Sequence, residues 1–277
     1  MAARIIDTAP AFEAFASRAA LESPFVRQQL WRDQYEAAHR DVFAAFYAGD
    51  ASPRHPLAQV RELARVRQQA RDGAAALGTV IEEVNEAVGV LLELPPEPAP
   101  THVLLVGGGS VNASVGRLGG AVAVFHCLEW FRSAEDWRVL AAHETAHAWH
   151  EIALGVSPPA DDLAWITFSE GLAVRASQEA VPGRPTCDYF WYGHPGFDAW
   201  LTWCRDHREQ LCAHLRDHVD DVSAASALFG SEQYEGHRRT GYFIAGELLT
   251  ATGRPLRDLV HLSVTEASDL IRSALDS

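Results

Sequence analysis

The sequence has 277 residues, of which 48% are hydrophobic, and a formal net charge of −14. A chain of this length and composition can bury a sizeable hydrophobic core, which excludes an intrinsically disordered protein. The acidic charge, without clusters of Lys and Arg, excludes a nucleic-acid-binding surface, because phosphate binding needs such clusters.

Signals for membrane insertion or export are missing from the sequence. No run of about 18 apolar residues occurs, so no membrane-spanning helix and no membrane partner are expected. The segment from Met1 to Pro10 has no basic stretch followed by an apolar one, so it does not resemble a secretory signal. The four cysteines are scattered: Cys127, Cys187, Cys204 and Cys212. This pattern suits a reducing compartment, and we expect a cytoplasmic protein.

The first third of the chain has a helical pattern. From about Ala11 to Glu93, apolar residues recur three and four positions apart, with a break from Asp50 to Pro56. A second break, from Pro95 to Pro100, contains four prolines in six residues and forms neither a helix nor a central strand. We therefore expect a helical N-terminal subdomain over residues 1–94, followed by a second domain over residues 101–277.

After the prolines the pattern changes to that of strands. His102–Val106 is short, apolar and partly β-branched, and Ala121–His126 is a second such segment, with a glycine-rich stretch from Gly107 to Gly120 between them. Beyond them the chain is helical again. Helices, then a small sheet, then helices predict the α+β class.

One predicted helix carries the strongest functional motif. Ser133 and Asp136 approximate a capping box, and Gly155 with the prolines that follow stops the helix, so the prediction is a helix over 134–154. It contains the sequence His143-Glu144-Thr145-Ala146-His147. Two histidines four residues apart on a helix differ by about 40° in direction, so both imidazoles can reach one metal ion. Glu144 lies beside them, where it can act on a metal-bound water as a general base without being a ligand.

A zinc hydrolase site needs a third protein ligand and leaves a fourth position for water. Glu170 is the best candidate. It lies in a second predicted helix, which begins after Asp161 or Asp162 and ends before Pro182, among small and apolar residues. A carboxylate in such surroundings is unfavourable unless a cation compensates it. The alternative is a glutamate in an ordinary salt bridge on the flank of a helix.

The combined motif resembles that of a known enzyme group. His143-Glu144-x-x-His147, followed after 22 residues by Glu170-Gly171-Leu172-Ala173, resembles the gluzincin metallopeptidases, which include thermolysin-like proteases and zinc aminopeptidases. It is closer still to bacterial families of predicted zinc-dependent proteases whose function is not known. Those families have a glycine-rich segment before the metal helix and a Gly-Tyr element after it, here Gly107–Gly120 and Gly241–Gly246.

The resemblance implies a mostly helical zincin-like catalytic domain with a small mixed sheet, and one zinc ion held by His143, His147 and Glu170. It also implies a donor for the oxyanion, for which Tyr242 is the first candidate and His237 the second. By the same analogy, Ala121–His126 is a candidate edge strand for pairing with an extended substrate. One position departs from the thermolysin pattern: Val174 stands where an acidic residue orients a histidine, so the partners of the metal-bound histidines are unassigned.

We therefore expect a zinc-dependent hydrolase that cleaves a peptide or amide bond by Glu144-assisted attack of zinc-bound water. Two alternatives remain open at this point. The chain could keep the zinc site as a catalytically silent binding or regulatory module, or it could be a zinc hydrolase for a non-peptide small molecule. Arg238 and Arg239 precede Tyr242 and are either substrate-carboxylate ligands or solvated charges at a helix start.

Overall fold

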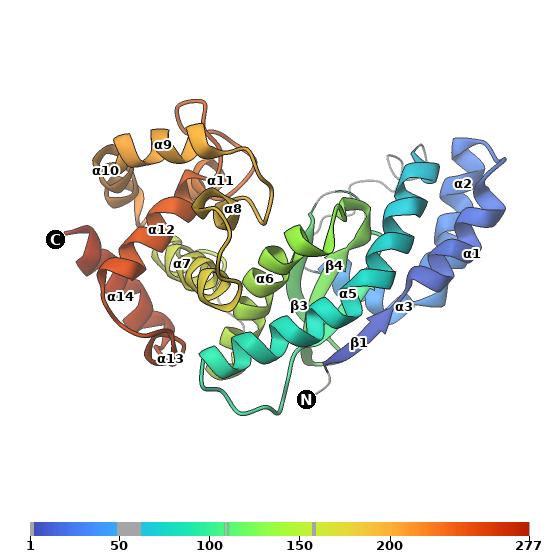
Figure 1. Ribbon diagram of the computed structural model, residues 1–277, viewed down its shortest axis with the longest axis horizontal. Helices are drawn as coiled ribbons and strands as arrows, with labels where there is room; N and C mark the ends of the chain where they lie inside the picture. The colour runs from blue at the N-terminus through green and yellow to red at the C-terminus, as the bar shows by residue number, and fades with distance from the viewer. Residues whose placement is uncertain (1–2, 49–61, 108, 110, 157–158, 277) are drawn as a thin grey trace. The chain divides into compact units, whose positions relative to one another are not determined.

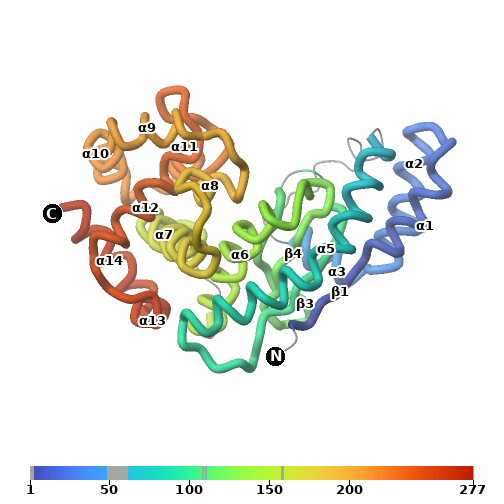
Figure 2. The backbone as a smooth tube through the Cα atoms, in the orientation of Figure 1, coloured from blue at the N-terminus to red at the C-terminus, as the bar shows by residue number. Residues whose placement is uncertain are grey.

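A computed structural model describes residues 3–48, 62–107, 109, 111–156 and 159–276. The expected break from Asp50 to Pro56 lies outside these residues. The chain is mostly helical with one small mixed sheet, so the α+β prediction is confirmed (Figure 1). It forms two compact units, one of Met1–Asn85 with Glu97–Trp137 and the other of Glu86–Pro96 with Arg138–Ser277. The tube in Figure 2 follows the chain through both.

The first unit combines the N-terminal helices with all the strands. Its elements are β1 (Arg4–Asp7), α1 (Ala9–Ala19), α2 (Pro24–Leu30), a π-helical segment (Trp31–Glu36), α3 (Arg40–Ala48), most of α5 (Leu63–Leu91), β2 (Thr101–Leu105), β3 (Ala113–Leu118), β4 (Ala121–Cys127), a 3₁₀ turn (Leu128–Trp130) and the start of α6 (Ala134–Leu154). The packing unit therefore crosses the boundary expected at residues 94–101, and a separately folding N-terminal subdomain stays a prediction.

The sheet has the order β1-β2-β4-β3, with β1, β2 and β4 parallel and β3 antiparallel to β4. The two predicted strands are confirmed as β2 and β4. The expectation that Ala121–His126 is an edge strand is wrong, because β4 is hydrogen-bonded to β2 on one side and to β3 on the other. The sequence did not indicate β1, which is only four residues long, or β3, whose Gly116 interrupts its pattern.

A buried tyrosine joins the N-terminal helices to the sheet. The Tyr35 ring contacts the rings of Phe12, Trp31 and Phe43 at centroid distances between 4.9 and 5.3 Å. Its hydroxyl oxygen lies 2.7 Å from Thr8 Oγ1 and accepts a hydrogen bond from the Val106 amide at 2.8 Å. These aromatic contacts and the satisfied hydroxyl give the helices and the sheet one common core.

Two histidines lie in the middle of the sheet. Trp137 Nε1 donates to His126 Nδ1 at 3.3 Å, and His126 Nε2 is 3.1 Å from His102 Nδ1. Because His126 accepts at Nδ1, it carries its hydrogen on Nε2 and donates it to His102. His102 then carries its own hydrogen on a buried Nε2 that has no partner among the described residues. Burial lowers the pKa of His102 to about 3. Burial also lowers the pKa of His126, and repulsion between the protonated forms of the two rings adds to this, so both rings are neutral.

The second unit is helical. Its elements are the end of α5, the rest of α6, α7 (Leu163–Ala180), α8 (Thr186–Phe190), α9 (Asp198–Asp206), α10 (Arg208–His218), a 3₁₀ turn (Val222–Ala224), α11 (Ala225–Leu228), α12 (Thr240–Ala251), α13 (Leu256–Leu259) and α14 (Val264–Leu275). The helix α7 packs against α12 and α14, and also against α8 and α13. It is therefore the central helix of this unit.

Among the described residues, no helix is both long enough and apolar enough to cross a membrane.

The neutral histidine pair predicts a loss of stability in acid. Each ring binds a proton with a pKa of about 6.5 in the unfolded chain but resists it in the fold. Above about pH 6.5 the pair does not reduce the free energy of unfolding. Below about pH 6.5 that free energy falls by about 1.4 kcal/mol per pH unit for each histidine. We expect the double variant His102→Phe/His126→Phe to flatten the acid limb of a urea-unfolding series from pH 7 to pH 4.

The exposed His261 supplies the control, since His261→Gln is expected to keep the wild-type slope. An unchanged slope in the double variant would contradict the assignment of the buried pair.

Candidate metal centre

The helix α6 has the bounds that the sequence predicted, and it carries two of the expected ligands. Ser133 Oγ accepts a hydrogen bond from the Asp136 amide at 3.1 Å, which caps the first turn. His143 is fully buried and His147 is partly exposed, with side-chain exposures of 1% and 17%. Both imidazoles therefore point from one face of α6 into a site that solvent reaches at His147.

The helix α7 carries the third expected ligand. Its start is fixed by Asp162, whose Oδ1 accepts from the Trp165 amide at 3.1 Å, and Glu170 lies two turns further on. Farther along α7, the Arg175 guanidinium donates to the carbonyl oxygens of Leu249 and Arg254, at 3.1 and 3.0 Å. These bonds tie α7 to the C-terminal end of α12, so Glu170 projects from a firmly held helix.

The three predicted ligands come together at one point. Glu170 Oε2 is 3.0 Å from His143 Nε2 and 3.4 Å from His147 Nε2, and the two nitrogens are 3.1 Å apart. In a tetrahedral zinc site with bonds of roughly 2.0–2.2 Å, ligand atoms lie about 3.3 Å apart. The observed triangle therefore fits one zinc ion with a fourth position left open. Among the described residues, this is the one group of His, Cys, Asp and Glu side chains with metal-ligand spacing.

The charges at the site also favour a cation. Burial disfavours the ionised form of Glu170, but His147 and the hydrogen bond with His143 outweigh it and hold the pKa of that carboxyl below its ordinary value. Burial likewise disfavours charge on His147, yet Glu170 raises its pKa. Burial lowers the pKa of His143 to about 4, so this ring is a neutral nitrogen ligand. The three groups thus offer one negative charge and two nitrogens, the donor set that Zn²⁺ prefers.

Ser169 supplies the partner that the sequence left unassigned. Its Oγ lies 3.0 Å from His147 Nδ1, the ring nitrogen that faces away from the triad. A metal-bound histidine donates its second N–H to such a group, which fixes the ring orientation. The sequence signal was the position of Ser169 immediately before Glu170 on the same helix. His143 Nδ1 is buried and has no hydrogen-bond partner in the described part of the chain.

Glu144 lies at the site without being one of the three ligands. It is 7% exposed, and burial raises its pKa to about 7, while the neighbouring His147 opposes the shift. Its position on α6 puts it one residue from His143 and three from His147. A carboxyl group with a pKa near neutrality can both accept and return a proton.

Two tyrosines line the site next to His143. The Tyr242 ring is 6.0 Å and the Tyr192 ring 5.0 Å from the His143 ring, centroid to centroid. Tyr192 Oη donates to Tyr242 Oη at 3.0 Å, so the hydrogen of Tyr242 is available to another acceptor. Burial, together with the charge of Glu170, raises the pKa of Tyr242 well above its ordinary value, and the hydroxyl keeps its proton. No sequence pattern singled out Tyr192, which lies in the turn after α8.

The remaining candidates lie in other contacts. The His237 ring stacks on Trp203 at 3.7 Å, and its Nδ1 is 3.0 Å from the Glu235 carbonyl oxygen. Its role as an oxyanion donor stays a prediction. His150 is buried against Trp165 and Phe168, with ring centroids at 5.1 and 5.7 Å, and burial lowers its pKa to about 3. The His150 ring is therefore enclosed by aromatic side chains of α7.

Glycines let α12 approach α7 at the site. A Cβ atom on Gly171 would lie 2.5 Å from the carbonyl oxygen of Ala245, and one on Gly246 would lie 3.1 Å from Val174 Cγ1. Gly171 directly follows Glu170 on α7, so this close backbone contact fixes the position of Glu170 relative to α12. Val174, the departure from the thermolysin pattern, is thus used for helix packing.

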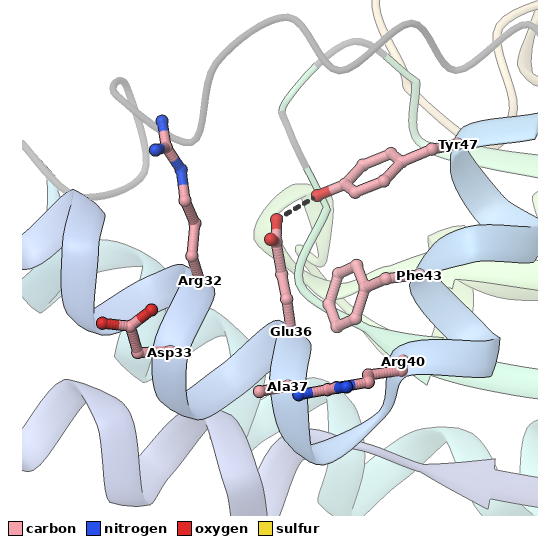
Figure 3. Close-up of a pocket in the computed structure, with 7 residues that line it drawn as sticks. All are labelled: Arg32, Asp33, Glu36, Ala37, Arg40, Phe43 and Tyr47. Carbon is pink, nitrogen blue, oxygen red and sulfur yellow. Dashed lines mark hydrogen bonds between the residues drawn. The ribbon is translucent and has the colours of Figure 1, made fainter.

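The first unit contains a separate pocket of about 410 Å³. Figure 3 shows its lining, which includes Arg32, Arg40 and Phe43. Glu36 inside it accepts hydrogen bonds from Tyr47 Oη at 2.6 Å and Trp31 Nε1 at 2.8 Å. Its carboxylate is therefore engaged by neighbouring side chains, and the pocket is not part of the metal centre.

The contact of Gly171 with Ala245 yields a stability prediction. Gly171→Ala adds a methyl group against a backbone oxygen that has no room to move, so we expect a destabilisation of about 1–3 kcal/mol and weaker zinc binding. The control is Gly78→Ala in α5, where no atom lies within 4 Å of the added Cβ and where a gain of up to about 1 kcal/mol is expected. Urea unfolding measures both variants, and equal effects would contradict this account.

Removal of the Ser169 hydroxyl tests the partner of His147. Ser169→Ala is expected to weaken zinc binding by about 10- to 100-fold, because the His147 ring loses its orienting hydrogen bond. Ser177→Ala is the control, since the Ser177 hydroxyl is buried on the same helix but bonds to the Val174 carbonyl oxygen. Competition with a chromophoric chelator gives both affinities, and a normal affinity in Ser169→Ala would exclude the role.

No family model, no curated protein and no solved structure matches the chain. The assignment of a metal centre therefore rests on three side chains and their mutual distances.

Proposed function

We propose that this chain is a zinc-dependent hydrolase that cleaves a peptide or amide bond. The observation that carries the proposal is the convergence of His143, His147 and Glu170, with their ligand atoms 3.0 to 3.4 Å apart. Three protein ligands with an open fourth position are typical of catalytic zinc, whereas structural zinc sites have four.

The proposal gives each neighbouring group one task. A zinc ion, when bound, supplies a Lewis acid that polarises a substrate carbonyl and lowers the pKa of a water molecule. Glu144 accepts the proton of the attacking water and passes it to the leaving amine. Tyr242 donates its free hydroxyl hydrogen to the carbonyl oxygen as negative charge develops there. Tyr192 holds the Tyr242 oxygen in place from the other side.

The resemblance to gluzincin metallopeptidases supports the same reaction class. The two ligand histidines and Glu144 lie on α6, Glu170 follows on the next helix, and Tyr242 lies in the helix that begins at Thr240. The chain keeps this order of elements without the acidic residue at position 174. Membership of that group is our proposal and rests on these residues.

Exchange of Glu144 separates catalysis from metal binding. Glu144→Gln is expected to retain wild-type zinc content, because the residue is not a ligand, and to lose about 10²- to 10⁴-fold in hydrolysis, because the proton acceptor is gone. Glu170→Ala is expected to lose the metal as well. Zinc is measured by atomic emission, and hydrolysis of a set of short synthetic peptides is measured by mass spectrometry before and after treatment with phenanthroline.

Glu135→Gln, an exposed position on the same helix, serves as the control and should match wild type in both measurements. Full activity in Glu144→Gln would disprove its role as the base. Zinc retained by the wild type without hydrolysis of any peptide would instead favour a binding module.

A further inference from the structure

Arg239 occupies an unusual place for a charged side chain. Its guanidinium carbon lies 3.9 Å from the ring centroids of both Tyr192 and Tyr242, so the group is held between the two rings. Its Nε donates to the Phe190 carbonyl oxygen at 2.7 Å, which fixes its direction. The side chain is therefore positioned by three contacts, and none of them is with an acidic group.

Arg239 makes no close ion pair within the described part of the chain. No carboxylate there lies within 4.0 Å of it, and its buried Nη2 has no hydrogen-bond partner. Burial opposes the charge, but Tyr192, which also hydrogen-bonds to the side chain, Tyr242 and the more distant Glu170 raise the pKa of Arg239 above its ordinary value. A guanidinium that is largely covered and has no carboxylate in direct contact is stabilised when an anionic ligand pairs with it.

The backbone at this place is also constrained. Four described non-glycine residues have a positive φ: Glu93, Tyr192, Glu235 and Arg239. Two of them, Arg239 with φ of 64° and Tyr192 with φ of 53°, are in van der Waals contact beside the metal centre. Residues in this region are strained, and such strain concentrates at ligand sites.

The distance from Arg239 to the metal ligands suits a short substrate. The Tyr192 ring contacts both, with its centroid 3.9 Å from the Arg239 guanidinium carbon and 5.0 Å from the centroid of the His143 ring. An extended peptide covers about 3.3–3.6 Å per residue, so these two contacts limit the gap to no more than about two or three residues. A scissile carbonyl at the metal and an anionic group at Arg239 can therefore belong to the same molecule.

From these contacts we infer that Arg239 binds a substrate carboxylate located one or two residues beyond the scissile amide. This inference rests on the proposed hydrolase function and names its substrate class: short peptides or amides with a carboxylate, at the chain end or on an acidic side chain. Arginine pairs with carboxylates through two parallel N–H donors, which fixes the orientation as well as the charge. The site selects an anion although the whole chain is acidic, because the cation is local.

Arg238 does not share this role. It is exposed, and its carbonyl oxygen accepts a hydrogen bond from Trp200 Nε1 at 2.8 Å. This bond holds the backbone just before Arg239. The two adjacent arginines thus offer a matched pair, one at the site and one in solvent.

The test measures a ratio of affinities within each protein. The probes are N-acetyl-Ala-Ala with a free C-terminal carboxylate and the same dipeptide with a C-terminal carboxamide, titrated calorimetrically into zinc-loaded and metal-free Glu144→Gln protein. A second pair, N-acetyl-Ala-Glu amide and N-acetyl-Ala-Gln amide, separates a side-chain carboxylate from a terminal one. Because both members of a pair bind the same sample, the fraction of correctly folded protein cancels.

We expect a carboxylate to bind roughly 10- to 100-fold more tightly than its uncharged counterpart, as for hydrogen bonds to a charged group. Arg239→Gln should abolish this preference, Arg239→Lys should keep part of it, and Arg238→Gln should leave it unchanged. Arg239→Lys retains the charge without the fork, so it remains informative if the glutamine variant unfolds.

Two results would overturn the inference: a preference below about twofold in the parent protein, or a preference that survives Arg239→Gln. Failure of the hydrolase proposal gives a different pattern, namely no zinc bound by the wild type or no hydrolysis of any peptide. The carboxylate ratio in metal-free protein still decides the role of Arg239 in that case.

Discussion

The placement of one carboxylate between two imidazoles is the constraint on which the second unit depends. Glu170 sits among apolar and small residues of α7, where an isolated charge is unfavourable, and the nitrogens of His143 and His147 compensate it at 3.0 and 3.4 Å. This contact requires Glu170 to lie at a definite position along α7. The cap at Asp162 sets where α7 begins, and the absence of a side chain at Gly171 lets α7 approach α12 closely. The positions of the candidate ligands therefore depend on how α7 packs.

Several ionisable side chains surround His143, His147 and Glu170. Glu144 and Tyr242 are both buried. Burial raises the pKa of Glu144 to about 7 and raises that of Tyr242 well above its ordinary value. Arg239 adds a cation to these surroundings, whereas Glu144 is a carboxyl group. A donor for an oxyanion, an acceptor for a proton and a partner for an anion thus lie around one ligand set. In a low-dielectric site, such preorganised groups are worth more than they are in water.

Much of the fold and of the candidate metal site could be predicted from local sequence. The caps at Ser133 and Asp162 and the prolines after each helix delimit α6 and α7, and the spacing of His143 and His147 places both on one face. The strands β2 and β4 were visible because they are continuous apolar runs. The strands β1 and β3 were not, since one is short and the other contains Gly116 and polar residues. The edge position of β4 was predicted incorrectly because strand order is not a local property.

The sequence by itself determined the class of fold, the two helices of the candidate metal site and the three candidate ligands, because caps, periodicity and residue spacing act over a few turns. Tertiary structure alone decided which residues surround them. Ser169 behind His147, Tyr192 against Tyr242, and Arg239 between two rings depend on helices and turns separated by tens of residues in the chain. Their roles follow from how α7, α8 and α12 pack, and no spacing rule encodes that packing.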